Sequence, residues 1–245
     1  MITVVILYWN RKLQLLRTLE SFCKSANKDF NVLIIDNNSP EPLKLNPYPF
    51  EVRILRLTDQ LSAKSYISAH NYGFYYALEC MNPDKIIMQH AEIFHNGDII
   101  SYANKVNEGN YISFACYSLG AGETPEMVTI KDKCMTYDGE SAWYNHPVYR
   151  PRFTHFCSAI TARNLKLLNG FDERFCHGIW YDDDYFLLQI RRLGLEIELC
   201  TNPFVFHQYH EISMTDRNKM NTNKAVFDSL QNESYKAKHL LTPDF

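Results

Sequence analysis

The sequence predicts an α/β protein with a mainly parallel central sheet flanked by helices. In the first ninety residues, β-branched runs typical of strands alternate with apolar residues at helical spacing. Such alternation favours a parallel sheet joined by right-handed crossovers. The chain has 245 residues, of which 46% are apolar, and this is enough to bury one sizeable core. Polar residues follow the ends of the expected strands, where sheets of this kind bind ligands.

The first half of the chain carries the clearest strand and helix signals. The run from Ile2 to Tyr8 predicts a buried strand, and Asn10 is expected to cap the helix that follows it. That helix is indicated by apolar residues that recur on one face, namely Leu15, Leu16, Leu19, Phe22 and Cys23. We expect further strands at residues 31–35, 52–57 and 85–88, and a helix over residues 62–80.

The second half of the chain is less regular. Helices are expected over residues 97–106, 162–168 and 184–193, and short strands at residues 111–116, 196–200 and 204–206. Residues 118–153 are rich in glycine and proline and predict an irregular or short-stranded region, which is usually functional when it is this long. We therefore expect one domain over residues 1–212, with halves at 1–95 and 96–212, and a polar helical tail at 213–245.

Composition excludes several classes of protein. The formal net charge is −3, from 25 basic and 28 acidic residues, so no strong basic field indicates a nucleic-acid partner. The seven cysteines contain no CxxC pair, which argues against a disulfide framework or a zinc ribbon and for a reducing compartment. No apolar run approaches the roughly 20 residues that span a bilayer. These features predict a soluble cytoplasmic protein without an integral membrane segment, and leave peripheral attachment to a membrane open.

Three adjacent carboxylates, Asp182, Asp183 and Asp184, stand between an aromatic loop and an apolar helix. Aspartate is a preferred helix N-cap, and acidic residues in the first turn complement the helix dipole. Capping explains one or two of these carboxylates better than it explains three. The triplet therefore indicates either a capped helix or chemistry on a cation or a proton.

A second group of polar residues follows the strand expected at residues 85–88. His90 and Glu92 are two residues apart, and in extended backbone this spacing puts both side chains on one face, where they can bind a divalent cation. His207 or His210, after a late strand, could complete such a site. The same residues can also be explained without a function, if His90 and Glu92 lie at an exposed strand end and His207 and His210 are surface or packing residues.

Two further patterns carry less information. Asp36 ends a strand in a turn rich in Asx residues, which turn chemistry alone can explain. His155 and Cys157 suggest a Cys–His nucleophile, but no supporting signature accompanies them. The chain has no GxGxxG or GxxxxGK[ST] loop, which argues against a dinucleotide oxidoreductase and a P-loop enzyme.

Six segments in order resemble the family-2 glycosyltransferases of the GT-A fold, over residues 2 to 210. The segments are Val4–Arg11 ("TYNR" turn), Asn31–Ser39, His70–Gly73 with Ala77 ("RNxG…A"), Ile86–Glu92 (the DxD position), Asn169–Phe175 ("GGFDE") and Tyr181–Gly194 ("EDxD…R…G"). The last two are also similar to the C-terminal half of galactosyltransferase-type GT-A enzymes. The sequence differs from the pattern where His90-Ala91-Glu92 replaces DxD and His70 replaces an arginine.

The resemblance implies an inverting glycosyltransferase that uses a nucleotide diphosphate sugar, with a UDP-sugar favoured, and a glycan or other hydroxyl acceptor. Residues 1–95 would bind the nucleotide sugar, and residues 96–212 would bind the acceptor and carry the chemistry. The implied donor-binding residues are Tyr8, Trp9, Asn10, Arg11, Asp36 and Asn71. His90, Glu92 and His207 would hold Mn²⁺ or Mg²⁺, and a histidine ligand favours Mn²⁺.

The same resemblance aligns Asp183 with the general base. Asp182 or Asp184 would then cap the helix, bind the acceptor or orient the base, and Trp180 and Tyr181 could stack on an acceptor sugar. Two alternatives stay open. One is a nucleotidyltransferase of similar fold, which usually needs a glycine-rich N-terminal loop with a basic residue. The other is a non-catalytic protein that binds nucleotide sugars or carbohydrates, which the altered DxD position keeps in consideration.

Overall fold

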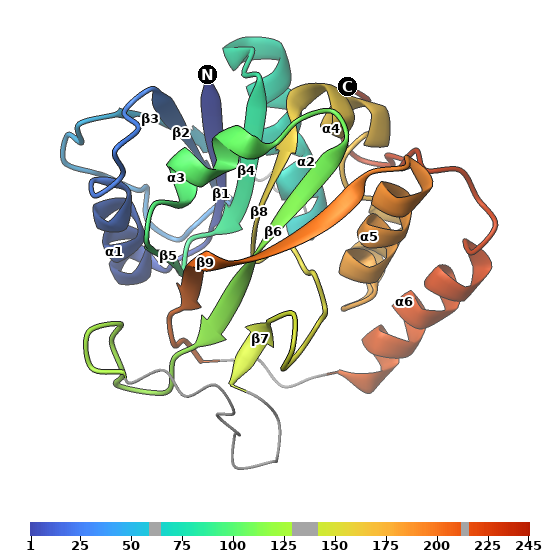
Figure 1. The fold of residues 1–245 in the computed structure, drawn as a ribbon. Helices are drawn as coiled ribbons and strands as arrows, with labels where there is room; N and C mark the ends of the chain where they lie inside the picture. Colours follow the sequence, from blue (N-terminus) through green and yellow to red (C-terminus); the bar gives the residue numbers. More distant parts are fainter. Residues whose placement is uncertain (59–64, 129–141, 212–215) are drawn as a thin grey trace.

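A central mixed sheet organises the molecule, seen in a computed structural model that describes residues 1–58, 65–128, 142–211 and 216–245 (Figure 1). In sheet order the strands are β3 (Glu51–Arg56), β2 (Phe30–Asp36), β1 (Ile2–Tyr8), β4 (Lys85–His90), β8 (Cys157–Thr161), β6 (Asn110–Ser118), β9 (Glu196–His207) and β5 (Ile93–Asn96). A short strand, β7 (Trp143–Asn145), pairs with β6.

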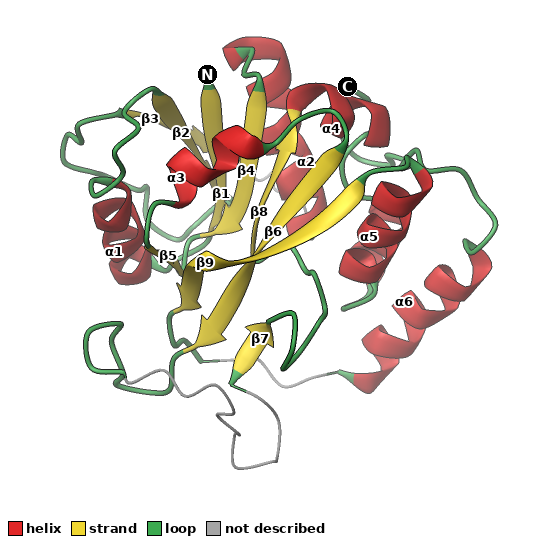
Figure 2. Ribbon diagram, viewed as in Figure 1, coloured by secondary structure: helices red, strands yellow, loops and turns green. Residues whose placement is uncertain are grey.

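Strand direction confirms the predicted α/β class. β1 runs parallel to β2 and β4, and β2 runs parallel to β3. β8 is antiparallel to both β4 and β6, so β6 again runs the same way as β4, and β9 is parallel to β6. The carboxyl ends of these parallel strands therefore lie at one edge of the sheet, and the strand arrows in Figure 2 show this common direction.

Helices cover both faces of the sheet, which explains why β1 and β2 are apolar along most of their length. Val4 and Ile6 pack into a core with α1 (Lys12–Phe22) and α3 (Ile99–Tyr102). Val5 faces the opposite core with α2 (Tyr66–Tyr76), α4 (Ala162–Leu168) and α5 (Asp182–Arg192). Because side chains alternate between faces along a strand, a strand buried on both faces has no polar side.

Several expected elements differ in extent from those observed. The helix expected at 97–106 is split into α3 and a 3₁₀ turn, η2 (Ala103–Lys105), and α2 continues as a π-helical turn, η1 (Ala77–Met81). Residues 196–207 form the single strand β9 rather than two strands. The expectation that Asn10 caps α1 is wrong, because Arg11 occupies the N-cap and Asn10 has a positive φ of 50°.

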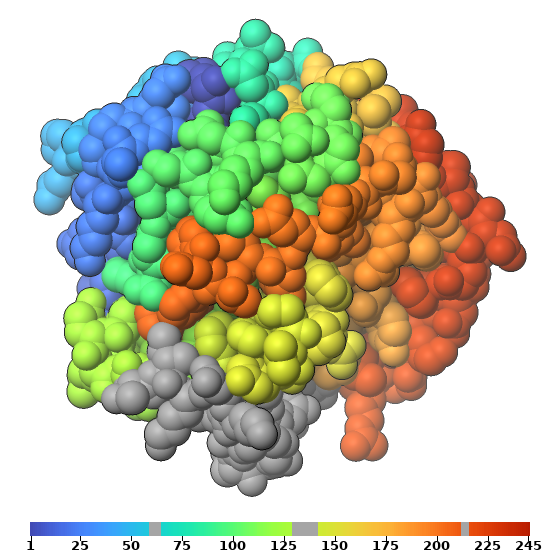
Figure 3. Space-filling view, in the orientation of Figure 1, coloured from blue at the N-terminus to red at the C-terminus, as the bar shows by residue number. Residues whose placement is uncertain are grey.

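The C-terminal residues pack against the domain. Helix α6 (Arg217–Ser229) contacts α5 and the 3₁₀ turn η3 (Glu173–His177). Beyond it, Ala237 donates its backbone N–H to the carbonyl of Leu168 at 2.8 Å, and Glu173 accepts from the backbone N–H groups at residues 240–242. In Figure 3 this segment, in red, covers the side of the molecule next to the orange region of α5. The boundary expected at residue 212 falls in a stretch outside the described residues, and it stays a prediction.

Two expectations from composition can be compared with the fold. Every cysteine in the described ranges is a free thiol; Cys134 lies outside them. Among the helices of the described residues, none is both long enough and apolar enough to cross a membrane.

Candidate functional site

Five of the nine histidines in the chain gather at the carboxyl edge of the sheet together with three buried or half-buried carboxylates. His90 ends β4, His207 ends β9, and Glu92 lies in the turn between β4 and β5. His155 lies just before β8, which starts at this edge because it is antiparallel to β4. The sheet topology thus brings together groups that are more than one hundred residues apart in the sequence.

Glu92 is the centre of the first cluster. Its carboxylate is only 2% exposed, and Oε1 lies 3.6 Å from His90 Nδ1, 3.7 Å from His207 Nε2 and 3.6 Å from His210 Nε2. Ligand atoms of Glu92, His207 and His210 are close enough together to hold one metal ion. The structure therefore brings together the three metal ligands expected from the sequence, and it adds His210.

The electrostatics of this cluster favour an ionised Glu92. Burial opposes ionisation, but the adjacent imidazoles of His210 and His90 hold the pKa of Glu92 well below its ordinary value. Arg11 donates from Nη1 to Oε1 at 2.7 Å and supplies a permanent positive charge. Burial lowers the pKa of His207 to about 4, so this imidazole is neutral at pH 7 and can act as a ligand.

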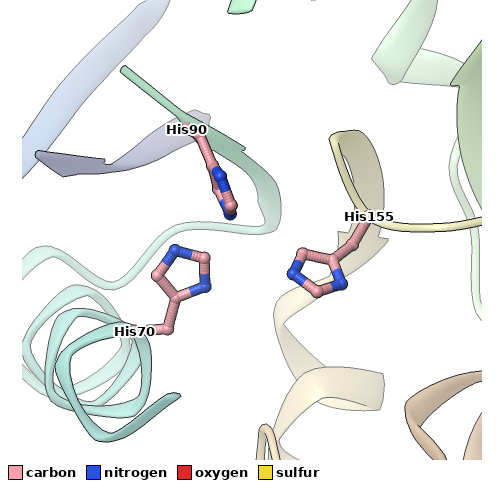
Figure 4. Close-up of side chains that lie close together, drawn as sticks. All are labelled: His70, His90 and His155. Carbon is pink, nitrogen blue, oxygen red and sulfur yellow. The ribbon is translucent and has the colours of Figure 1, made fainter. Parts of the chain in front are cut away.

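The second cluster consists of three histidine rings in mutual contact. His70 from α2, His90 from β4 and His155 from the segment before β8 turn toward one another (Figure 4). Their ring centroids are separated by 5.3 Å (70 to 90), 6.0 Å (70 to 155) and 5.9 Å (90 to 155). Burial, followed by the neighbouring histidines, lowers the pKa of His70 well below its ordinary value, so this ring is neutral. His90 belongs to both neighbourhoods, since its Nδ1 faces Glu92.

The three adjacent aspartates open α5 and lie in three different environments. Asp182 is 5% exposed and accepts a 2.7 Å hydrogen bond from the hydroxyl of Tyr66. Asp183 is half-buried and forms an ion pair with Nδ1 of His155, while Asp184 is exposed. None of them is the N-cap, because Tyr181 takes that position with a positive φ of 65° and no side-chain cap bond forms. The first turn therefore favours the aspartates through the helix dipole rather than through capping.

The environments separate the proton affinities of these carboxylates. Burial and the neighbouring charge of Asp183 raise the pKa of Asp182 to about 6. Burial also opposes ionisation of Asp183, but the imidazole of His155 outweighs it and lowers the pKa of Asp183 below its ordinary value. The reciprocal effect of Asp183 overcomes burial and raises the pKa of His155. At neutral pH, Asp183 is therefore ionised, and its side chain is partly open to solvent.

The raised pKa of Asp182 gives a stability prediction. Its folded-state pKa, about 6, exceeds the ordinary value of 3.8, so the folded state holds the proton more tightly and loses stability as pH rises between these values. Asp182→Asn keeps an oxygen acceptor for Tyr66 and removes the charge. We expect it to raise the free energy of unfolding by roughly 1–3 kcal/mol at pH 7.5, with little effect at pH 4. Urea unfolding at both pH values measures this, with the exposed Asp184→Asn as control. A gain at pH 4 equal to that at pH 7.5 would contradict the charge explanation.

The predicted donor residues line the ends of β1 and β2. Tyr8 is buried, while Trp9 is 55% exposed and Asn10 donates its backbone N–H to Ser39 Oγ. The carboxylate of Asp36 is fully buried, where Oδ2 accepts from Arg56 Nη1 at 3.1 Å and Oδ1 accepts from the backbone of Ser39. Asp36 therefore stabilises the turn after β2, and its predicted contact with a nucleotide base stays a prediction.

Asn71 occupies a position that favours a structural role. Its side-chain amide donates to the carbonyl of Phe171 at 2.8 Å and its oxygen accepts from the backbone N–H of the same residue. Gly170, with a φ of +66°, lies so close that an added Cβ would be 2.5 Å from Asn71 Oδ1. This pair joins α2 to the turn that leads into η3, and the predicted contact of Asn71 with the donor stays untested.

The two predicted acceptor residues precede α5. Trp180 is 57% exposed, and its carbonyl accepts a hydrogen bond from Asn223 in α6. Tyr181 is partly buried, with its ring 5.6 Å from that of Phe227. Trp180 is therefore the ring that remains available for a ligand, whereas Tyr181 is used mainly in packing α5 against α6.

Sequence reasoning missed or undervalued several residues of this site. His155 was considered only beside Cys157, yet the thiol of Cys157 points to Gln89 and His95, and burial raises its pKa well above the ordinary value. That geometry removes the Cys–His nucleophile hypothesis. No sequence pattern indicated Tyr66, because its partner Asp182 is distant in the sequence. The same holds for Arg56, whose partner Asp36 lies on the neighbouring strand.

A separate cavity of about 240 Å³ is lined by residues of α1 and the segments near Phe94 and Pro125. None of the candidate site residues lines this cavity. The site is instead defined by its buried charged groups at the edge of the sheet.

The comparisons with known proteins find the same fold in solved structures. No protein-family model matches the chain, and no curated protein matches it by sequence. TarS from S. aureus in complex with UDP-GlcNAc is similar with a TM-score of 0.60 and 11% identity, covering 86% of this chain and 59% of that chain. GalNAc-T7 with UDP, GalNAc and Mn²⁺ has a TM-score of 0.64 and 15% identity, covering 96% of this chain and 48% of that chain.

A third similar structure is more nearly matched in length. It is a Drosophila β-1,4-galactosyltransferase 7 variant with manganese, UDP-Gal and xylobiose, with a TM-score of 0.53 and 15% identity, covering 90% of this chain and 79% of that chain. The chain thus has the GT-A fold, as the sequence predicts. It spans about three fifths of the TarS chain and about half of the GalNAc-T7 chain.

Proposed function

We propose that this protein is an inverting glycosyltransferase that moves a sugar from a nucleotide diphosphate donor to a hydroxyl acceptor. The observation that carries this proposal is that the Glu92 cluster, with His207 and His210, and the Asp183–His155 pair lie close together, with His90 next to both. One group suits a divalent cation and the other suits a proton, as the reaction requires. The similar solved structures with bound nucleotide sugars support this proposal.

The Glu92 cluster fits a divalent cation by the chemistry of its donors. It offers a carboxylate oxygen and two imidazole nitrogens, a set that favours Mn²⁺ over Mg²⁺. The bound cation would neutralise the charge that develops on the leaving diphosphate. Arg11, already at 2.7 Å from Glu92, adds a positive charge on the same side, where it can bind a phosphate oxygen.

Asp183 is proposed as the general base for the acceptor hydroxyl. His155 fixes one carboxylate oxygen through Nδ1 and keeps the group ionised, which leaves the second oxygen to accept the proton. A positioned carboxylate of this kind typically contributes about 10²–10⁴-fold to the rate. Trp180, exposed just before α5, is proposed to stack on an acceptor sugar, and Trp9 is proposed to lie beside the nucleotide.

A thermal-shift panel tests the donor. UDP-, GDP- and dTDP-sugars are added to the protein with and without Mn²⁺, and we expect a UDP-sugar with Mn²⁺ to raise the Tm most. A ligand that binds only the folded state stabilises it by about 2.7 kcal/mol at a concentration of 100 Kd. Free sugars and uridine serve as controls. If no nucleotide sugar raises the Tm under any metal condition, the proposed donor site is wrong.

A further inference from the structure

His70 is the one member of the site whose burial has no explanation in the proposed transfer reaction. The side chain is 1% exposed, and neither ring nitrogen has a hydrogen-bond partner among the described residues. A buried polar atom without a partner destabilises the folded state, because it has lost its hydrogen bonds to water. Phe74 and Phe171 pack against the ring, so an apolar side chain would fit this place at lower cost.

The other two histidines of the group are oriented by carboxylates. Nδ1 of His90 faces Glu92 at 3.6 Å, and Nδ1 of His155 is paired with Asp183. An imidazole that gives its Nδ1 proton to a carboxylate presents the lone pair of Nε2, which is the usual arrangement around protein-bound zinc. Nε2 of His90 is buried without a partner among the described residues. Figure 4 shows one nitrogen of His155 directed toward His70 and His90 and the other directed away.

The spacing of the rings fits one shared ion. With metal–nitrogen distances of about 2.0–2.1 Å and tetrahedral angles, the ring centroids of three ligands lie ~5–5.5 Å apart. The observed centroid separations are 5.3, 6.0 and 5.9 Å, and one nitrogen from each ring lies within 4.8 Å of the other two. Small rotations of the rings would therefore close the group around an ion.

We propose that His70, His90 and His155 form a second cation site, separate from the Glu92 cluster and selective for Zn²⁺ or Co²⁺ over Mg²⁺ and Mn²⁺. Three imidazole nitrogens suit borderline metals, whereas Mg²⁺ and Mn²⁺ prefer oxygen ligands. Three protein ligands leave a fourth tetrahedral position for water or a ligand hydroxyl, as in catalytic zinc sites. The ion would join α2, β4 and the segment before β8 at the point where Asp183 approaches.

Visible absorption of Co²⁺ tests this site. Titrating metal-free wild-type protein with CoCl₂ should produce the intense ligand-field bands of four-coordinate Co²⁺, and Zn²⁺ should abolish them by displacement. Loss of a residue that only hydrogen-bonds to a metal ligand typically weakens metal binding by roughly 10–100-fold. His70→Asn and His155→Asn each remove a proposed ligand, so each should weaken Co²⁺ binding by at least this factor. The exposed His177→Ala, which removes a histidine elsewhere, should keep the bands.

The two cation sites can be separated by a pair of variants. His210→Ala should weaken Mn²⁺ binding, followed by electron paramagnetic resonance, and keep the Co²⁺ bands, whereas His70→Asn should do the reverse. Zinc-edge anomalous diffraction from wild-type crystals should place Zn²⁺ among the three rings, and this does not depend on a variant that folds. Zinc bound only at Glu92, His207 and His210 would overturn the second site and leave the proposed transfer function intact. Unchanged Co²⁺ bands in folded His70→Asn would overturn it equally.

Discussion

Asp183→Asn is expected to lower kcat for sugar transfer by about 10²–10⁴-fold, with donor affinity changed less than about twofold. The carboxamide has the same shape as the carboxylate and fits the first turn of α5, but it cannot accept the proton of the acceptor hydroxyl. His155 pairs with this side chain and lowers its pKa, which favours the ionised form in the folded protein. The effect should therefore fall on kcat, because donor contacts are assigned to other elements.

Nucleotide release in the presence of donor and acceptor measures turnover, and calorimetry with the donor measures binding. Asp184→Asn is the matched control, since it removes an adjacent and exposed charge from the same helical turn. We expect this control to keep most of the wild-type rate. If the protein is a non-catalytic binding protein, the wild type and both variants should bind the donor without turnover. If Asp183→Asn keeps the wild-type rate, Asp183 is not the general base.

The acid limb of the rate profile follows from the same pair. An ordinary aspartate has a pKa near 3.8, and His155 lowers that of Asp183, so the base stays ionised throughout the mildly acidic range. Asp182, with a pKa of about 6, gains its proton in that range without being the base. Its protonation removes a neighbouring negative charge, so the rate of Asp182→Asn should depend less on pH between 5 and 7 than the wild-type rate.

The sequence was sufficient for the fold and for much of the site because both depend on local patterns. The strands at Ile2–Tyr8 and Phe30–Asp36 are buried on both faces, and their continuous apolar runs are visible without a structure. Glu92 follows an apolar strand, so its position at the sheet edge followed from the parallel order. The resemblance of Tyr181–Gly194 to the "EDxD…R…G" segment, and not the strand order, predicted the role of the Asp triplet.

The remaining parts of the site depend on contacts that no local pattern records. His155 follows a region with little regular structure, and it reaches the site only because β8 runs antiparallel beside β4. The Cys157–Thr161 strand is short, with only Ile160 and Thr161 as β-branched residues, and was not expected. His70 was considered only as a departure from an arginine, because a buried histidine on a helix resembles a packing residue until its unpartnered nitrogens are seen.

Glu92→Gln is expected to remove the Mn²⁺ dependence of donor binding. Glu92 is the only carboxylate in the cluster with His207 and His210, and glutamine offers a neutral, weaker ligand. The change also leaves Arg11 without its 2.7 Å partner. In the wild-type protein, Mn²⁺ should increase donor affinity, whereas in the variant, affinity should be the same with Mn²⁺ or EDTA. Glu108→Gln, at an exposed salt bridge, is the control and should respond to Mn²⁺ like the wild-type protein.

The same substitution has a separate signature in stability. The pKa of Glu92 is lowered well below 4.5 in the folded state. The ionised carboxylate therefore stabilises the fold at pH values above 4.5, and this stabilisation is lost as the pH falls through the folded-state pKa. The stability difference between wild type and Glu92→Gln should therefore be largest near pH 7 and shrink below pH 4.5. Because Arg11 is partly exposed, solvent screening makes this difference smaller than for a fully buried ion pair. If Mn²⁺ continues to strengthen donor binding in the folded variant, the cation does not depend on Glu92, and the proposed Mn²⁺ site is wrong.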